Sequence, residues 1–393
     1  MKIRLLVVTA ILFLSSCSEK DKDQLTSSNS LINTSHLDAL YEDITVEGKS
    51  MGIIHIYSNY PDYEWIGDDD EGIACIDDAA RATIFYLKNY QLNNDIASLT
   101  KVKQLTEFLL FMQSENGFFY NFIFEDHSIN RMHRNSLNIA DWWSWRAMWA
   151  LSEGYKVFKT TNVKFSKQIL KCLETSVETT KKSFPKEKTI QKIDGIEFPN
   201  WLPYESAGDQ ASILVVALLN YLTETGDTSV TNYINDLCNG ILLMQKGDST
   251  NIPYYTFLSW QGLWHAYGYL IKQNYLSSFE IKKVNDGFEF SGRNKFSQIA
   301  YNFRPMIYAC LEAYELTNDS AYAFKAVEIS KWFFGKNIAA TQMYYPSTGR
   351  CFDGINSDID VNKNSGAEST IEALLSIQAI ETYNISEELL QNH

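Results

Sequence analysis

Cysteine and proline are both scarce in this chain of 393 residues, which contains six cysteines and seven prolines. The cysteines are scattered and form no C-x-x-C pair, so the sequence indicates neither a disulfide framework nor a zinc site. No Pro/Gly-rich or low-complexity stretch divides the chain after residue 35. Its length therefore indicates one large closed architecture or two domains. We predict no metal and no cofactor.

Positive charge is also in deficit, because 34 Lys and Arg residues face 48 Asp and Glu residues, giving a formal net charge of −14. This balance argues against a nucleic-acid partner and against a polyanionic ligand bound by bulk electrostatics. Aromatic residues are abundant, with nine Trp, 23 Tyr and 22 Phe. Aromatic faces are a common surface for stacking sugar rings, so a carbohydrate ligand fits this composition.

The N-terminus has an apolar run too short to span a bilayer as a helix. Lys2 and Arg4 precede this run over residues 5–14, and small residues then lead to Cys17, as in a cleaved signal peptide. The ending Leu-Ser-Ser-Cys resembles the lipobox of bacterial lipoproteins, which implies that residues 1–17 are a signal peptide and that Cys17 is lipidated. The alternative is an ordinary secretory signal. Residues 18–35 are polar and predict a flexible tether. We expect an exported protein, anchored by lipid to a bacterial membrane on its periplasmic or outer surface.

A repeating pair of helices organises residues 36–393. Six segments are apolar around most of a helical circumference, which predicts burial on more than one side: 71–90, 138–158, 205–225, 256–272, 296–316 and 365–383. The segments between them have apolar residues at three- and four-residue spacing, typical of one-sided amphipathic helices: 36–45, 96–113, 165–182, 230–245, 276–288 and 320–335. Two concentric rings follow. We predict an all-α (α/α)6 toroid with short hairpins or loops at its mouth, rather than an open helical solenoid.

Two adjacent acids open the first inner helix. Asp77 and Asp78 lie in an apolar, Ala-rich stretch, where carboxylates are costly unless they have partners or a task. Arg81 is one helical turn away from both, so a local ion pair is the structural explanation. That pair accounts for one acid but poorly for two, and both are therefore candidate catalytic residues.

Glu368 opens the last inner helix, after a loop rich in Asn, Asp and Gly that contains Asp353 and Asn364. A capping box from Asn364 or Ser365 to Glu368 would explain the acid structurally. The short polar side chains of the loop also suit a hydroxylated ligand. Because the first and last helices of a closed ring are neighbours, Glu368 could meet the acid pair.

These stretches resemble a known domain. Residues 72–82, which contain Asp-Asp-Ala-Ala-Arg-Ala, are similar to the Asp-Asp-x-Ala-Arg-Ala motif of a toroid domain of the six-hairpin glycosidase superfamily, a type also attached to some bacterial glycosyltransferases. Residues 332–337, 345–354 and 362–370 resemble its late part. Ala79 and Ser365 depart from the expected Asn and Gln, which leaves the substrate open. The layout also resembles family-nine endoglucanases. That resemblance implies Asp77 or Asp78 as general base and Glu368 as general acid of an inverting glycoside hydrolase.

The other inner-helix starts predict a sugar-binding wall of aromatic and charged side chains, although each Trp alone would also suit a core. The residues predicted to bind substrate are Arg81, Trp142, Trp145, Glu205, Asp209, Trp260, His265, Arg304 and Asn364.

The leading interpretation is a glycoside hydrolase acting on an oligo- or polysaccharide, with the membrane contacted through the Cys17 lipid. Polysaccharide lyases and uronate epimerases share the scaffold and need a Tyr or His base with a group that neutralises a carboxylate. Tyr301 with Arg304, or His265, could supply these. A non-catalytic glycan-binding lipoprotein and a phosphorylase are the remaining alternatives.

Overall fold

The computed structural model describes residues 30–193, 196–244, 265 and 297–383. The chain divides into a short N-terminal unit, residues 1–31, and a large unit, residues 32–393. The fold and the site below belong to the large unit. No helix in the described ranges is long and apolar enough to cross a membrane. The predicted signal peptide, Cys17 and most of the tether lie outside the described residues.

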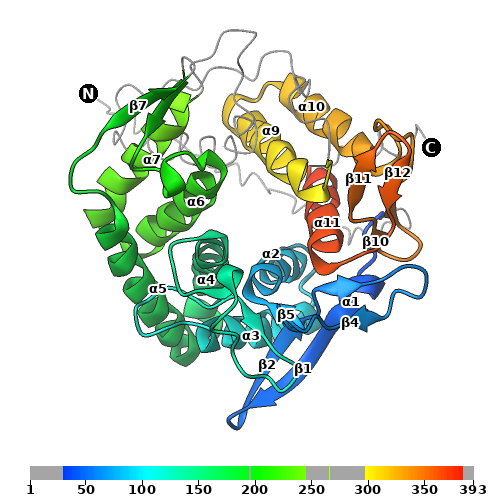
Figure 1. Ribbon diagram of the computed structural model, residues 1–393, viewed down its shortest axis with the longest axis horizontal. Coiled ribbons are helices and arrows are strands. Elements are labelled where there is room, and N and C mark those ends of the chain that lie inside the picture. The colour runs from blue at the N-terminus through cyan, green and yellow to red at the C-terminus, as the bar shows by residue number, and fades with distance from the viewer. Residues whose placement is uncertain (1–29, 194–195, 245–264, 266–296, 384–393) are drawn as a thin grey trace, which may run out of the picture. The chain divides into compact units, whose positions relative to one another are not determined.

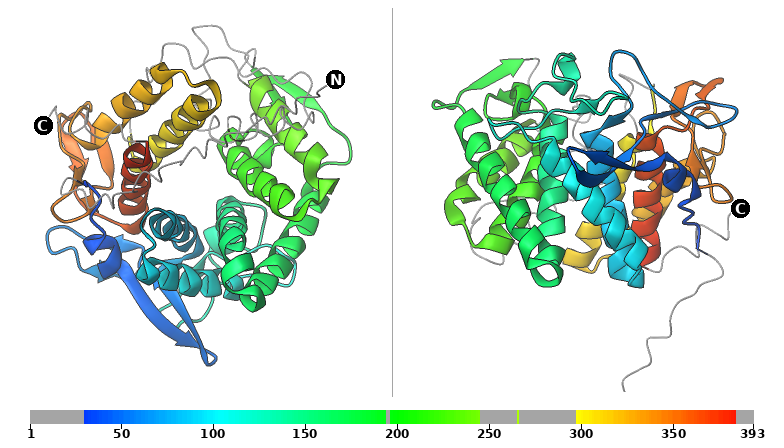
Figure 2. Two further views of the ribbon diagram at one scale, coloured as in Figure 1. Left: turned by 180° about the vertical axis from the view of Figure 1, so that it is seen from behind. Right: turned by 90° about the horizontal axis from the view of Figure 1, so that it is seen from below.

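The large unit is a ring of helices (Figures 1 and 2). Its inner helices are α2 (Ile76–Asn93), α4 (Trp142–Thr161), α6 (Gly208–Thr225), α9 (Arg304–Thr317) and α11 (Ala367–Thr382). Its outer helices are α3 (Ile96–Phe111), α5 (Val163–Ser183), α7 (Thr231–Met244) and α10 (Ser320–Ser330). The inner helices are buried around most of their circumference; in α6 this burial is continuous from Gly208 to Leu222. Helix α11 packs against both α2 and α9, so the last inner helix adjoins the first.

Each described inner helix begins later than its apolar pattern predicts, because the polar starts of the segments form loops, strands and short 3-10 helices. The fourth pair of predicted segments, 256–272 and 276–288, lies outside the described residues except for His265, which is helical.

The prediction of an outer helix over residues 36–45 is wrong. Residues 36–45 form only the short helix α1 (Ser35–Leu40), after which the chain continues as strand β1 (Tyr41–Val46), paired antiparallel with β2 (Lys49–Ile54). Ile44, Thr45 and Val46 are β-branched and lose side-chain freedom in a helix, which favours the extended conformation.

Short antiparallel hairpins account for the other strands, as the sequence predicts for the mouth of the ring. They are β3 (Tyr57–Ser58) with β4 (Trp65–Ile66), β5 (Ala74–Cys75) with β6 (Phe122–Ile123), β7 (Ile190–Ile193) with β8 (Ile196–Pro199), β9 (Tyr344–Tyr345) with β10 (Arg350–Cys351), and β11 (Gly354–Ser357) with β12 (Asp360–Asn362). Strand β5 leads directly into α2. Just before it, Gly72 has φ +120°, and a Cβ there would lie 2.1 Å from the carbonyl oxygen of Ile123. Glycine thus permits the close approach that sets the start of α2.

Candidate active site

Arg81 is the centre of an ion-pair network between the first and last inner helices. Its Nη1 donates to Asp78 Oδ1 over 2.5 Å, and its Nη2 donates to Glu368 Oε2 over 2.5 Å. Its Nε lies 3.1 Å from Glu372 Oε1, within ion-pair distance but not aligned as a hydrogen bond. The guanidinium is buried, so its charge needs these carboxylates. Arg81 therefore brings together acids that are 290 residues apart in the sequence.

Glu368 does not take part in a capping box. The N-cap of α11 is Gly366, and no side chain caps the helix. The Glu368 side chain instead bonds Arg81 and is 42% exposed, whereas Asp78 is buried. Of the three acids paired with Arg81, Glu368 is therefore the one that a ligand can reach.

Asp77 lies in a neighbouring ion pair rather than on Arg81. Its Oδ2 accepts a hydrogen bond from Arg146 Nη1 over 2.6 Å, while its Oδ1 is buried and has no hydrogen-bond partner among the described residues. The Arg146 guanidinium also lies 4.6 Å from the centre of the Trp142 ring and 5.0 Å from that of Tyr301, as in cation–π contacts. Trp142 thus contacts a charged side chain inside the ring of helices.

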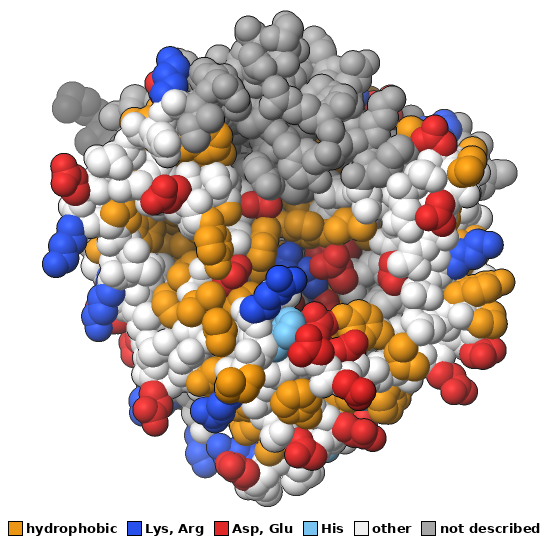
Figure 3. Space-filling model, in the orientation of Figure 1, with side chains coloured by type: hydrophobic (Ala, Val, Ile, Leu, Met, Phe, Trp, Pro, Cys, Tyr) orange, Lys and Arg blue, Asp and Glu red, His pale blue; other side chains and the backbone are white. Residues whose placement is uncertain are grey.

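A pocket of about 330 Å³ opens beside this network. Its lining includes three acids, Asp78, Asp353 and Glu368, together with hydroxyl and amide side chains that suit a polyol: Tyr57, Ser297, Asn356, Asn362 and Ser369. Figure 3 shows acidic and basic side chains gathered in a hollow near the centre of one face of the molecule. We call the space lined by these residues the carboxylate pocket.

The protonation of two pocket acids differs from that of ordinary aspartates. Burial raises the pKa of Asp78 to about 6; the Arg81 guanidinium opposes this shift and the Glu368 charge adds to it. Burial also raises the pKa of Asp353, opposed by hydrogen bonds from Ser369 and Gly366 and reinforced by Glu368. Acids with raised pKa values beside an exposed carboxylate form an arrangement that can move protons near neutral pH.

Searches of known proteins found no match to a family model and none to a curated protein sequence. Solved structures do match. A sugar epimerase from a ruminal bacterium has a TM-score of 0.57 at 12% identity, over 84% of this chain and 92% of its own. A D-mannose isomerase gives 0.55 at 12% identity, covering 84% of this chain and 91% of its own. A cellobiose 2-epimerase from Bacillus thermoamylovorans B4167 gives 0.54 at 13% identity, covering 84% and 92%.

The fold is an (α/α)6 toroid. At these identities the likeness extends to the fold alone, which confirms the fold class predicted from the helix repeat. The predicted catalytic trio is divided within this toroid: Asp78 and Glu368 share Arg81 and the carboxylate pocket, and Asp77 pairs with Arg146.

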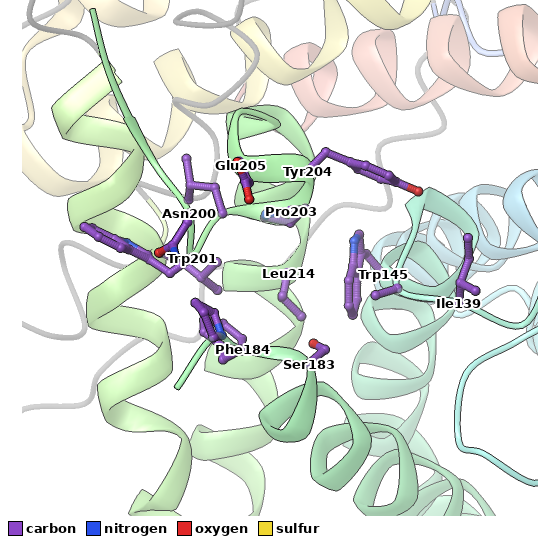
Figure 4. A pocket seen from close by; sticks show the side chains of 14 residues that line it. Ile139, Trp145, Ser183, Phe184, Asn200, Trp201, Pro203, Tyr204, Glu205 and Leu214 are labelled. Atoms are coloured by element: carbon purple, nitrogen blue, oxygen red, sulfur yellow. The ribbon is translucent and has the colours of Figure 1, made fainter. Parts of the chain in front are cut away.

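The predicted sugar-binding wall is dispersed. Trp145 and Glu205 line a second pocket of about 370 Å³ near the starts of α4 and α6, where the indoles of Trp145 and Trp201 and the ring of Phe184 surround Leu214 (Figure 4). We call this the aromatic pocket. Trp142 and Trp145 thus have different surroundings although they are one turn apart.

Three predicted binding residues have structural neighbours rather than a place on the carboxylate pocket. Arg304 is fully buried and ion-paired with Glu372, so its position favours a structural role. The imidazole Nδ1 of His265 lies 3.2 Å from Glu312 Oε1. Asn364 accepts a hydrogen bond from the backbone N–H of Tyr60 over 3.0 Å.

Asp209 is buried at the start of α6, and burial raises its pKa while Arg146 opposes the shift. Trp260 lies outside the described residues. Sequence reasoning missed two residues of the network, Glu372 and Arg146. Glu372 is one turn after Glu368 and is followed by the apolar residues Ala373, Leu374 and Leu375, a signal of the same kind as Asp78. Arg146 follows the Trp cluster of α4.

Proposed function

We propose that the protein is a carbohydrate-active enzyme and, more specifically, a glycoside hydrolase. One observation carries this proposal: Asp78, Asp353 and Glu368 line a single pocket whose other polar groups are hydroxyls and amides. Glycoside hydrolysis requires a proton donor and a carboxylate on opposite sides of the scissile bond. Amide and hydroxyl groups are suited to binding sugar hydroxyls because they both donate and accept hydrogen bonds.

The charge of the pocket favours an uncharged glycan over a uronate. Among the described residues, Arg81 is the cation that pairs with the lining acids, and it already faces three carboxylates. The interior arginines Arg146 and Arg304 are likewise paired with Asp77 and Glu372. Within the described part of the chain, a substrate carboxylate would therefore meet negative side chains without a guanidinium to neutralise it. This argues against the lyase and uronate-epimerase alternatives, which need such a cation.

Glu368 is the acid best placed to contact substrate, since it is partly exposed and reaches the pocket. A guanidinium that donates to a carboxylate favours its ionised form. In that form Glu368 can accept a proton from water or stabilise the positive charge of an oxocarbenium-like transition state. We propose this role for Glu368 in place of the general-acid role that the family-nine resemblance implies. The inverting outcome also remains a proposal.

A sugar epimerase or isomerase is the second candidate, because the solved structures with this fold include enzymes with those names. Such an enzyme rearranges one sugar without releasing another. The same pocket could serve it if Glu368 removed a proton from a sugar carbon.

Product analysis of the full chain separates the candidates. Proton NMR is recorded while the protein is incubated with neutral oligosaccharides, a uronic-acid oligosaccharide and free monosaccharides. A hydrolase releases new reducing ends from a neutral oligosaccharide, and an inverting one forms the opposite anomer first. Isomerised monosaccharide without chain cleavage would favour the epimerase, and unsaturated product from the uronate would contradict the hydrolase. Binding of a glycan without turnover would support the non-catalytic alternative.

We also propose lipid anchoring at Cys17 and export to a bacterial membrane, on the basis of the lipobox-like sequence. Metabolic labelling with a palmitate analogue in a bacterial host tests this. The wild-type chain should be labelled and the Cys17→Ala chain should not; label on both would contradict the assignment.

A further inference from the structure

Asp353 differs from the other two acids of the carboxylate pocket in its surroundings. It lies between β10 and β11, just before the β11–β12 hairpin that precedes α11. Its Oδ1 accepts hydrogen bonds from Ser369 Oγ over 2.6 Å and from the Gly366 backbone N–H over 2.8 Å. These two bonds fix the orientation of the carboxyl group. Its Oδ2 accepts no hydrogen bond from the described part of the chain and is left for the pocket.

The other two acids are less able to give a proton to a ligand. Both oxygens of Asp78 are engaged, Oδ1 by Arg81 and Oδ2 by the Cys75 thiol over 3.1 Å, and the side chain is buried. Glu368 is reachable, but the Arg81 guanidinium donates to it. No cation of the described residues lies within ion-pair distance of Asp353, so nothing comparable favours its charged form.

We propose that Asp353 is the general acid of the site and that Glu368 is its complementary base. This inference rests on the proposed hydrolase function and deepens it. The Asp353 Oδ2–H proton passes to the glycosidic oxygen as the bond from that oxygen to the anomeric carbon breaks. A water molecule bonds to the anomeric carbon and gives its proton to Glu368. Solvent then returns a proton to Asp353 and removes one from Glu368, so the cycle balances.

The electrostatics of the pocket agree with this division. Burial raises the pKa of Asp353, and the negative charge of Glu368 raises it further. Among the described titratable groups, Asp78 and Tyr57 also line the pocket, and Cys351 interacts with Asp353. Cys351 is buried and burial raises the pKa of its thiol, so it stays neutral; Tyr57 is a phenol whose pKa burial also raises.

Leaving-group dependence tests the proposal. The substrates are a neutral oligosaccharide that the wild type cleaves and the glycosyl fluoride of the same sugar, because fluoride departs with little need for protonation. Asp353→Asn should lose about 100-fold or more of kcat on the oligosaccharide but less than about 10-fold on the fluoride. Glu368→Gln should lose activity on both. The exposed Asp358→Asn, in the neighbouring hairpin turn, is the matched control and should behave as wild type.

The opposite pattern would overturn the proposal: Glu368→Gln would then retain activity on the glycosyl fluoride, and Asp353→Asn would lose it. Full activity of Asp353→Asn would overturn it as well. If the wild type cleaves no glycoside, the hydrolase function itself fails, and this outcome differs from the other two.

A second measurement does not depend on a substrate. In full-length protein with ¹³C-labelled Asp carboxyls, the Asp353 signal is identified as the one missing from Asp353→Asn. It should titrate above an ordinary aspartate, and it should move to lower pH in Glu368→Gln, because a negative neighbour is removed. If the Asp353 signal titrates like that of an ordinary aspartate and does not change in Glu368→Gln, the result would contradict the general-acid role. Thermal unfolding of each variant shows that it folds.

Discussion

The carboxylate pocket and the aromatic pocket are similar in size, about 330 and 370 Å³, and both adjoin the starts of inner helices. They differ in what those starts carry. The carboxylate pocket has three acids, two of which, Asp78 and Glu368, pair with the buried guanidinium of Arg81. The aromatic pocket has indole and phenyl rings with a single carboxylate, Glu205. We therefore expect the chemistry in the carboxylate pocket, where opposed charges lie together, rather than in the aromatic pocket.

Removing the positive charge of Arg81 should have the largest effect on the difference between the two pockets. Arg81→Met leaves Asp78 and Glu368 without their partner and weakens the pairing of Glu372. Breaking a buried ion pair from one side costs about 3–5 kcal/mol, so the free energy of unfolding measured in urea should fall by about that much, with loss of activity. The control is Arg131→Met, at an exposed residue, with a change within about 0.5 kcal/mol. Unchanged stability in Arg81→Met would contradict the network.

The matched pair Glu368→Gln and Glu205→Gln compares the two pockets directly. Loss of an acid–base residue typically costs about 10²–10⁴ in rate. We expect Glu368→Gln to lower kcat within that range on a cleavable neutral oligosaccharide, and Glu205→Gln to leave kcat within about 3-fold. Equal losses in both variants would remove the functional distinction between the pockets.

The inner helices could be predicted from the sequence because apolar periodicity is local. Residues 36–45 could not, since their spacing also fits a strand and no helix-ending signal marks Leu40. The acids of the site were visible as charges in apolar stretches, but their partners were not. Which acid pairs with Arg81 depends on the closure of the ring, and Asp77 turns instead to Arg146 on the next inner helix. The sequence places Asp353 in a loop suited to a hydroxylated ligand but does not mark it as an acid of the site, because its burial comes from tertiary contacts.

Acid pH should reveal the buried acids of the carboxylate pocket. The folded-state pKa of Asp78 is raised to about 6 by burial, above its value in an unfolded chain. Between about pH 4 and 6 the folded protein therefore binds more protons than the unfolded chain does. The contribution of Asp78 to the free energy of unfolding falls as pH rises through this window. The free energy of unfolding, measured in urea at a series of pH values, should fall less over this window in Asp78→Asn than in the wild type. An identical slope in the two proteins would contradict the shift.

The smallest effect is expected at the aromatic pocket. Glu205 is exposed, and its side chain makes no ion pair with described residues. Glu205→Gln should change the free energy of unfolding by less than about 0.5 kcal/mol. A larger loss of stability would indicate that the structure of the aromatic pocket depends on the charge of Glu205.

The most direct test of the central claim is a crystal structure of Glu368→Gln with a bound neutral oligosaccharide that the wild type cleaves. The sugar should occupy the carboxylate pocket, with a glycosidic oxygen within hydrogen-bond distance of Asp353 and the anomeric carbon facing residue 368. Sugar bound only in the aromatic pocket, against Trp145 and Trp201, would contradict the assignment of the chemistry to the carboxylate pocket.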